Sequence, residues 1–348
     1  MFCLSSAKVS FFDDYSTIRR NFRTFVNHFF IIMDIIIKGL QEEVARKAIY
    51  VTPQQFEYGL VQKHILVTGA NGQLGNEIRQ RHTLLKNYKF FFTDIDELDL
   101  CDYAAISDFV VHHNIQYIVN CAAYTAVDKA EDEQESCWKV NCETVGNLAK
   151  SAAGKAKVIH VSTDYVFDGK SHRPYIETDP TNPQSIYGKS KLAGEEQLML
   201  HCPENIIIRT AWLYSSFGNN FVKTMLRLGK EKESLTVVAD QTGTPTYAGD
   251  LAAAILQIIA RTEEKQTFTP GIYHYSNEGI CTWYDFAMQI HRLAGITTCK
   301  IHPIPTSEYP TKATRPMYSV LDKTKIKQTF DIEIPEWEES LEACMALI

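Results

Sequence analysis

The sequence predicts an α/β protein built on a doubly wound parallel sheet, with a smaller α/β lobe in its C-terminal part. Three observations predict this class. From residue 63 onward, short β-branched or aromatic runs alternate with segments of helical apolar spacing. A glycine-rich turn joins the first of these runs to the first helical segment. The chain has 348 residues, of which 45% are hydrophobic and 22% charged, and these values are typical of a large globular protein.

The predicted strands are short apolar runs that end in small or polar residues. In chain order they are His64–Thr68, Tyr88–Thr93, Gln116–Asn120, Lys157–Ser162 and Asn205–Thr210. The predicted helices have apolar residues at helical spacing. They are a segment that places Leu74, Ile78 and Leu85 on one face, followed by Ser136–Ala153, Tyr187–His201, Asp250–Arg261 and Thr282–Gly295. Strands and helices that alternate in this way predict a parallel sheet covered on both faces.

Residues 1–62 do not share this pattern. They carry a formal charge of +1, whereas residues 63–348 carry −8. Their apolar run, residues 25–37, is too short to span a membrane, and no cleavage site of a signal peptide follows it. We interpret residues 1–62 as an N-terminal extension of unknown role, either a loosely packed appendage or the product of a start codon placed too early, in preference to a membrane anchor.

Charge and cysteine usage limit the partners and the compartment. The net charge of −7 argues against an extended nucleic-acid surface, because phosphate binding depends on clustered Lys and Arg. The nine cysteines are scattered and form no Cys-x-x-Cys motif, which is typical of free thiols in a reducing compartment. We therefore expect a cytoplasmic protein that binds neither nucleic acid nor membrane.

The glycine-rich turn is Gly69-Ala70-Asn71-Gly72-Gln73-Leu74-Gly75. In a strand-to-helix turn of this kind, the first glycine allows the sharp bend, the second lets a diphosphate approach the backbone, and the third lets helix and strand pack closely. The diphosphate binds to the unpaired amides at the helix N-terminus. The turn predicts a Rossmann-type dinucleotide-binding domain over residues 63–233. Residues 234–348 are then mainly the substrate lobe, with some crossing of the chain between the two.

The acidic end of the second strand bears on the choice of dinucleotide. Asp94 lies 25 residues after the first glycine of the turn, where a carboxylate can hydrogen-bond the adenosine ribose. Such a carboxylate repels a ribose 2′-phosphate and favours NADH over NADPH. Asp96 or Glu97 could take the same position, and Arg79 and Arg81 are the nearest cations that could offset the charge. The sequence thus leaves NADPH and NADH both open.

A Tyr-x-x-x-Lys pair, Tyr187 and Lys191, lies at the start of a predicted helix. Residues four apart lie on one helix face, where an ammonium lowers the pKa of a phenol and prepares it for proton transfer. Thr163 follows the preceding strand, 24 residues before Tyr187, and strand ends of a doubly wound sheet face the ligand crevice. These three residues are the catalytic candidates.

These features, taken together, resemble the extended short-chain dehydrogenase/reductases. Longer motifs resemble the dTDP-4-dehydrorhamnose reductase branch of that family over about residues 63–346. They are NCAAYTAVDKAE (120–131), VSTDYVFDG (161–169), YGKSKLAGE (187–195), RTAWLYS (209–215), DQTGTPTYAGDLA (240–252), a YHYSNEG…TWYDFA stretch (273–287) and ATRPMYSVLD (313–322).

The resemblance implies that hydride from NADPH or NADH reduces the C4 keto group of dTDP-4-dehydro-L-rhamnose, a step of cell-surface polysaccharide synthesis. It implies that Tyr187 donates the proton, that Lys191 lowers its pKa and binds the nicotinamide ribose, and that Thr163 orients the keto oxygen. The implied cofactor contacts are Gly69, Gly72, Gln73, Leu74, Gly75, Asp94, Asp99, Leu100, Ala122, Ala123, Tyr124, Tyr187 and Lys191. The implied substrate contacts are Thr163, Asp164, Tyr165 and Trp212, to which we add Arg315, a cation suited to the nucleotide diphosphate.

Two alternatives stay open at this point. One is another nucleotide-sugar reductase or epimerase. The other is a non-catalytic regulatory subunit resembling the beta subunit of methionine adenosyltransferase, which the intact set of Thr163, Tyr187 and Lys191 disfavours. The resemblance also leaves open a homodimer and a magnesium ion, since Glu77 matches one of the glutamates that hold magnesium in some members.

Overall fold

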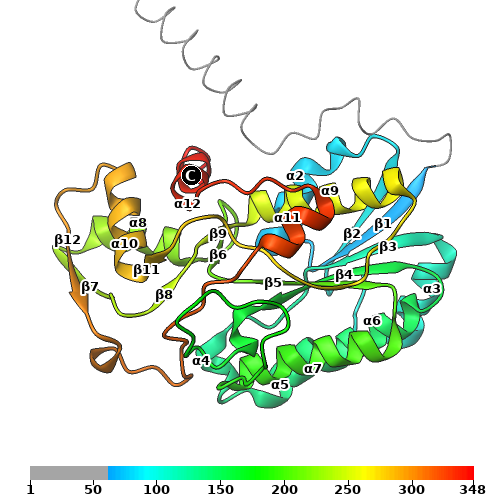
Figure 1. Cartoon of the computed structure of the whole chain (residues 1–348), viewed down its shortest axis with the longest axis horizontal. Helices are drawn as coiled ribbons and strands as arrows, with labels where there is room; N and C mark the ends of the chain where they lie inside the picture. Colours follow the sequence, from blue (N-terminus) through cyan, green and yellow to red (C-terminus); the bar gives the residue numbers. More distant parts are fainter. Residues whose placement is uncertain (1–61) are drawn as a thin grey trace, which may run out of the picture. The chain divides into compact units, whose positions relative to one another are not determined.

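A six-stranded parallel sheet forms the centre of the structure, a computed structural model that describes residues 62–348 (Figure 1). The strand order is β10-β5-β4-β3-β1-β2. The strands are β1 (Lys63–Thr68), β2 (Tyr88–Thr93), β3 (Ile115–Asn120), β4 (Lys157–Thr163), β5 (Asn205–Thr210) and β10 (Gly271–His274). The predicted doubly wound parallel sheet is therefore confirmed. The extension of residues 1–62 lies, apart from residue 62, outside the described residues, and its role stays a prediction.

Helices cover both faces of this sheet (Figure 1). One face carries α2 (Gln73–Arg81), α9 (Ala248–Lys265) and α11 (Thr324–Phe330), which share one apolar core with the sheet. The other face carries α3 (Tyr103–His112), α6 (Thr144–Ala152) and α7 (Ile186–His201), which share a second core. Because both faces are covered, Ile65, Leu66 and Val67 of β1 are all fully buried, as expected for a central parallel strand.

Several helices differ from the prediction, and three of them flank the cofactor side of the sheet or its connections. The first ends at Arg81, so Leu85 lies beyond it, although its side chain joins the same core as Leu74 and Ile78. The predicted helix over residues 136–153 begins earlier, as α5 (Gln134–Trp138), and passes through a π-helical turn before α6. Helix α3 was not predicted; Asp102 caps its N-terminus by accepting from the amide of Ala105.

The C-terminal part of the chain builds a smaller lobe beside the sheet (Figure 1). Its helices are α8 (Phe221–Glu231), α10 (Trp283–Leu293) and α12 (Trp337–Met345). Its strands form three two-stranded sheets: β6 (Leu213–Tyr214) with β9 (Thr246–Tyr247), β7 (Ser234–Val238) with β12 (Lys300–Ile304), and β8 (Thr242–Gly243) with β11 (Cys281–Thr282). In the sequence, β10 follows β6, β7, β8 and β9 of the lobe, yet it pairs with β5 in the main sheet. The domain boundary at residues 233/234 stays a prediction.

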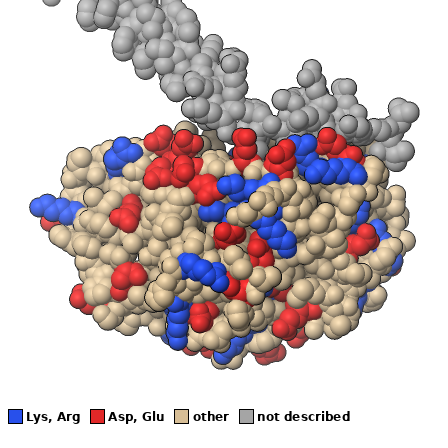
Figure 2. Space-filling view, in the orientation of Figure 1, with Lys and Arg blue, Asp and Glu red and all other residues tan. Residues whose placement is uncertain are grey.

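The surface carries charges of both signs. On the face drawn in Figure 2, Lys and Arg side chains are interspersed with Asp and Glu. Within residues 62–348, none of the helices combines the length and the hydropathy that crossing a membrane requires.

Candidate active site

A cavity of about 470 Å³ opens at the carboxyl ends of β1, β2 and β3. In the strand order, β1 and β3 are neighbours, and the chain leaves β1 toward β2 on one side but leaves β3 toward β4 on the other, so the winding direction reverses between them. A doubly wound sheet binds its ligand in the crevice at such a switch point. The cavity is lined by Thr68, Gly69, Asn71, Gly72, Thr93, Asp94, Ile95, Leu98, Asp99, Leu100, Cys101, Cys121, Ala122, Ala123, Val140 and Thr144.

The glycine turn has the geometry that its sequence predicts. Gly69 has a φ of +63°, and a Cβ there would lie 2.6 Å from the amide nitrogen of Ala122. A Cβ at Gly75 would lie 2.5 Å from the carbonyl oxygen of Gly69, so this glycine lets α2 pack against the turn. At Gly72 a Cβ would contact only that same carbonyl oxygen, at 3.2 Å. The turn therefore leaves its backbone open to the cavity at Gly72, which fits a dinucleotide diphosphate at the start of α2.

Asp94 lies at the end of β2, where the sequence predicts the ribose contact. Its carboxylate accepts hydrogen bonds from the amides of Asn71 and Ile95, both at 2.9 Å. The nearby arginines are engaged elsewhere: Arg81 is ion-paired with Glu77, and Arg79 lies over the ring of Phe92.

Tyr187 and Thr163 lie together at the carboxyl end of β4. The Thr163 hydroxyl donates to Asp164 at 3.0 Å and accepts from the amide of Tyr165 at 3.3 Å. Burial raises the pKa of the Tyr187 phenol, and a hydrogen bond with Thr163 lowers it. Burial also raises the pKa of Asp164, to about 7.

Lys191 is hydrogen-bonded to strand β4. Its Nζ donates to the carbonyl oxygen of Val161 at 2.7 Å, and burial lowers its pKa to about 8. The sequence suggests that Lys191 lowers the pKa of Tyr187. In the structure, the residue that lowers this pKa is Thr163. Lys191 acts on the pKa of Cys121, a lining residue of the cavity, so its ammonium lies near the cavity wall.

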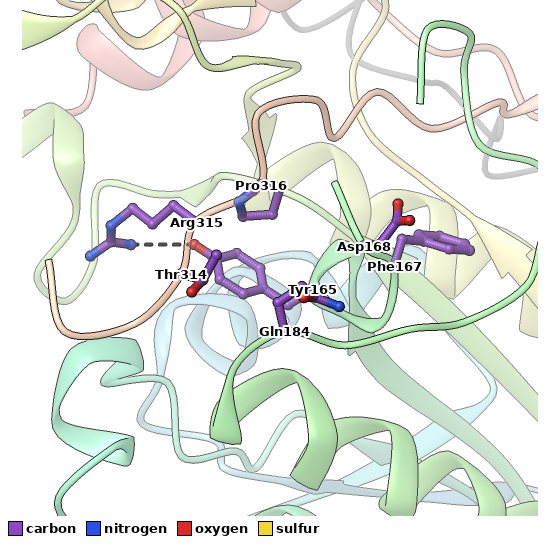
Figure 3. A pocket seen from close by; sticks show the side chains of 7 residues that line it. All are labelled: Tyr165, Phe167, Asp168, Gln184, Thr314, Arg315 and Pro316. Atoms are coloured by element: carbon purple, nitrogen blue, oxygen red, sulfur yellow. Dashed lines mark hydrogen bonds between the residues drawn. The ribbon is translucent and has the colours of Figure 1, made fainter. Parts of the chain in front are cut away.

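Two of the residues predicted to bind the substrate, Tyr165 and Arg315, lie together next to Tyr187. The ring of Tyr165 meets that of Tyr187 edge to face, with 5.4 Å between the ring centroids. Arg315 donates to the Tyr165 hydroxyl at 3.2 Å, beside a small hollow (Figure 3). Trp212 lies in the smaller lobe at a φ of +49° and stacks on Trp283, 3.6 Å between ring centroids. A bulky residue at positive φ is strained and is held there by its surroundings.

Several predicted cofactor residues do not line the cavity with the others. The Leu74 side chain packs in the core, so only its position at the helix start fits the prediction. Gln73 accepts from Asn220, and the Tyr124 hydroxyl donates to Glu133. Conversely, the sequence interpretation missed lining residues such as Thr68, Cys121 and Thr144. The first two could have been found, because they end or follow predicted strands β1 and β3.

Glu77 does not fit a magnesium site. Its carboxylate is buried, accepts from the Ser215 hydroxyl at 2.5 Å and is ion-paired with Arg81. Among residues 62–348, no group of three or more His, Cys, Asp or Glu side chains is arranged to hold a metal ion. We derive no step through magnesium.

Comparisons with known proteins show the family of this chain. A family model described as "RmlD substrate binding domain" matches residues 63–348. A dTDP-4-dehydrorhamnose reductase of Aggregatibacter actinomycetemcomitans is 42% identical over 283 residues, covering 80% of this chain and 96% of that protein. This chain belongs to the dTDP-4-dehydrorhamnose reductase family.

Solved structures of the dTDP-4-dehydrorhamnose reductase family share the fold. The enzyme of Clostridium acetobutylicum is 45% identical, with a TM-score of 0.76, over 82% of this chain and 99% of that one. The enzyme of Bacillus anthracis, solved in complex with NADP, is 37% identical, with a TM-score of 0.78, over 83% of this chain and 100% of that one. The family match begins at residue 63, so residues 1–62 lie outside it.

Proposed function

We propose that this protein reduces the C4 keto group of dTDP-4-dehydro-L-rhamnose to give dTDP-L-rhamnose, with NADPH or NADH as hydride donor. The observation that supports the proposal is the pairing of Tyr187 with Thr163 at the carboxyl end of β4, in a chain of this family. A bound nicotinamide supplies the hydride. All other steps depend on side chains of the protein itself.

Tyr187 donates the proton in this proposal. Burial favours the protonated phenol, and the phenol is hydrogen-bonded with Thr163. When the keto oxygen of the sugar accepts the phenol hydrogen, the phenol can neutralise the negative charge that develops on that oxygen. A donor aimed at developing charge stabilises the transition state more than the ketone, which is the basis of its effect on the rate.

The other candidate residues orient the two reactants. The amides at the start of α2 and the open backbone at Gly72 bind the cofactor diphosphate. Asp94 binds the adenosine ribose, and Lys191 the nicotinamide ribose. Tyr165, Trp212 and Arg315 contact the nucleotide sugar, with Arg315 on its diphosphate. We place the reaction in the cytoplasm, since the eight cysteines of the described part are free thiols.

A coupled assay tests this function. The purified full-length chain is mixed with dTDP-4-dehydro-L-rhamnose and either NADPH or NADH, and both cofactor oxidation and dTDP-L-rhamnose are measured. We expect equal amounts of cofactor oxidised and product formed. Oxidation only with a different nucleotide sugar would indicate another reductase or an epimerase of this fold, and no oxidation with any of them would indicate a regulatory subunit.

A further inference from the structure

A chain of buried polar side chains runs beneath the cavity, from the end of β1 to helix α7. The Thr68 hydroxyl donates to Oδ1 of Asn120 at 2.7 Å, and Nδ2 of Asn120 lies 3.0 Å from Nδ1 of His160. Nε2 of His160 in turn lies 3.5 Å from Nζ of Lys191. Each of the four side chains is at most 2% exposed. Buried polar chains of this kind fix the hydrogen positions of their members.

The direction of each hydrogen bond in this chain follows from one backbone amide. The Ala122 amide can only donate, and it donates to Oδ1 of Asn120 at 3.1 Å. Asn120 therefore presents its Nδ2 hydrogens to His160, and Nδ1 of His160 must accept. A neutral imidazole carries one hydrogen, so in His160 it is on Nε2. A doubly protonated ring would bring two donors face to face, and burial lowers the pKa of His160 well below its usual value.

The Nε2 hydrogen of His160 consequently points at Lys191. A lysine ammonium can only donate, so His160 offers it no acceptor. Within the sheet, Nζ donates to the Val161 carbonyl oxygen, at 2.7 Å. The distance from Nζ to Nε2 of His160 is longer, 3.5 Å, as expected when two donors face each other. The remaining N–H groups of Nζ are thus left for acceptors on the side of the cavity and Tyr187.

We propose that His160 is a positioning residue for Lys191: held by Asn120 as the Nε2–H tautomer, it denies Lys191 a second acceptor within the sheet and directs the remaining N–H groups of Nζ to the site. The part of this inference that concerns Lys191 during turnover rests on the proposed function. The tautomer of His160 does not.

Other ionisable groups also face these residues. Glu195, Cys137 and Cys121 raise the pKa of Lys191, while burial has the larger effect and lowers it to about 8. Lys191 is the charged group that acts on His160. An acceptor in place of the His160 N–H would stabilise the ammonium and raise the pKa of Lys191.

Nitrogen NMR on the full-length protein labelled with ¹⁵N-histidine tests the tautomer directly. We expect the His160 ring at neutral pH to show a protonated Nε2 and an unprotonated Nδ1. Its signals are assigned by their loss in His160→Gln. If that variant does not fold, Lys191→Met assigns them instead, because it removes the amine that faces Nε2. A hydrogen on Nδ1, or a charged ring, would overturn the inference whether or not the protein is a reductase.

The pH dependence of kcat tests the effect on Lys191. If its ammonium form is the active one, the rate falls as the pH rises through the pKa of Lys191. The side-chain amide that His160→Gln introduces can turn its oxygen toward Nζ, so this fall should move to higher pH by about one unit. His291→Gln, at a buried histidine of the smaller lobe, should leave it in place. An active His160→Gln with an unmoved pH profile contradicts the proposal.

Discussion

Arg315 is ion-paired with Asp128 of α4 (Val127–Ala130), although 187 positions separate the two residues in the sequence. Asp128 also accepts from the amide of Ala313, so the segment before Arg315 is held to α4 at two points. Because Arg315 also contacts Tyr165, this attachment places a guanidinium close to the candidate active site (Figure 3).

Arg315→Met tests the diphosphate contact. We expect the KM for the nucleotide sugar to rise about 10- to 100-fold, the loss of hydrogen bonds to a charged group, with a smaller change in kcat. Lys312→Met is the matched control. Lys312 lies in the same segment as Arg315 and is also ion-paired, with Asp132, but its side chain is 62% exposed. Equal KM values for Arg315→Met and Lys312→Met would rule out a specific role of Arg315.

Tyr187→Phe removes the proposed proton donor and keeps the ring. We expect kcat to fall by about 10²- to 10⁴-fold, the usual contribution of a general acid. The dissociation constant for NADH, followed by its fluorescence, should change little. Near-normal turnover in this variant would show that another group supplies the proton.

Asp94→Ala tests the choice of cofactor. Removing the carboxylate at the end of β2 should raise the ratio of kcat/KM with NADPH to that with NADH by about tenfold, because a ribose 2′-phosphate no longer meets a negative charge. Asp96→Asn changes an exposed carboxylate two residues on and should leave the ratio unchanged. The same ratio in Asp94→Ala and the parent protein would contradict the ribose contact.

Asp164 should make stability depend on pH. Burial raises its pKa from 3.8 to about 7, so between these values the folded state holds a proton that the unfolded state has lost. The free energy of unfolding therefore decreases as the pH rises through this window, by an amount on the order of 4 kcal/mol at most.

Urea unfolding at a series of pH values should show this decrease in the parent protein and a flatter profile in Asp164→Asn. Asp168 is a control in which the pH dependence of stability has the opposite sign, because its hydrogen bond with Tyr175 lowers the pKa of its carboxyl. Asp168→Asn should remove stability that the parent protein gains as the pH rises. Parallel profiles for Asp164→Asn and the parent would contradict the raised pKa.

The buried ion pair between Glu195 and Arg209 should matter more to stability than a surface pair. Both side chains are at most 3% exposed, and Arg209 makes two hydrogen bonds to the carboxylate, at 3.0 and 2.7 Å. Glu195→Gln leaves a buried charge without its counter-charge and should lower the free energy of unfolding by about 3–5 kcal/mol. Glu231→Gln, in an exposed i,i+4 pair with Arg227, should lower it by less than about 1 kcal/mol.

The main sheet could be predicted from local patterns. The bounds of β2 and β5 agree with the sequence prediction because each is a continuous apolar run flanked by polar or turn-forming residues. The π-helical turn between α5 and α6 could not be predicted. Asn141, within that turn, bonds both main-chain groups of Tyr124 and the Ser190 hydroxyl, so the local helix geometry depends on contacts with other elements.

The candidate site likewise combines features that local sequence patterns predict with features that depend on contacts between distant residues. The glycine turn and the Tyr187–Lys191 spacing are local, and the sequence displays them directly. The partner of Arg315 and the hydrogen-bond chain that reaches Lys191 through His160 depend on residues far apart in the sequence. No periodicity or motif of a single segment contains that information, since each contact exists only after the sheet has formed.

The place of β10 in the sheet has a consequence for synthesis on the ribosome. The edge beside β5 is completed only when residues 271–274 have emerged, and α9, which covers α2, is made only shortly before them. A nascent chain that already contains the whole glycine turn and Tyr187 therefore still exposes an apolar helix face and an unpaired strand edge. We expect such a chain to be a substrate for chaperones until β10 has emerged and paired with β5.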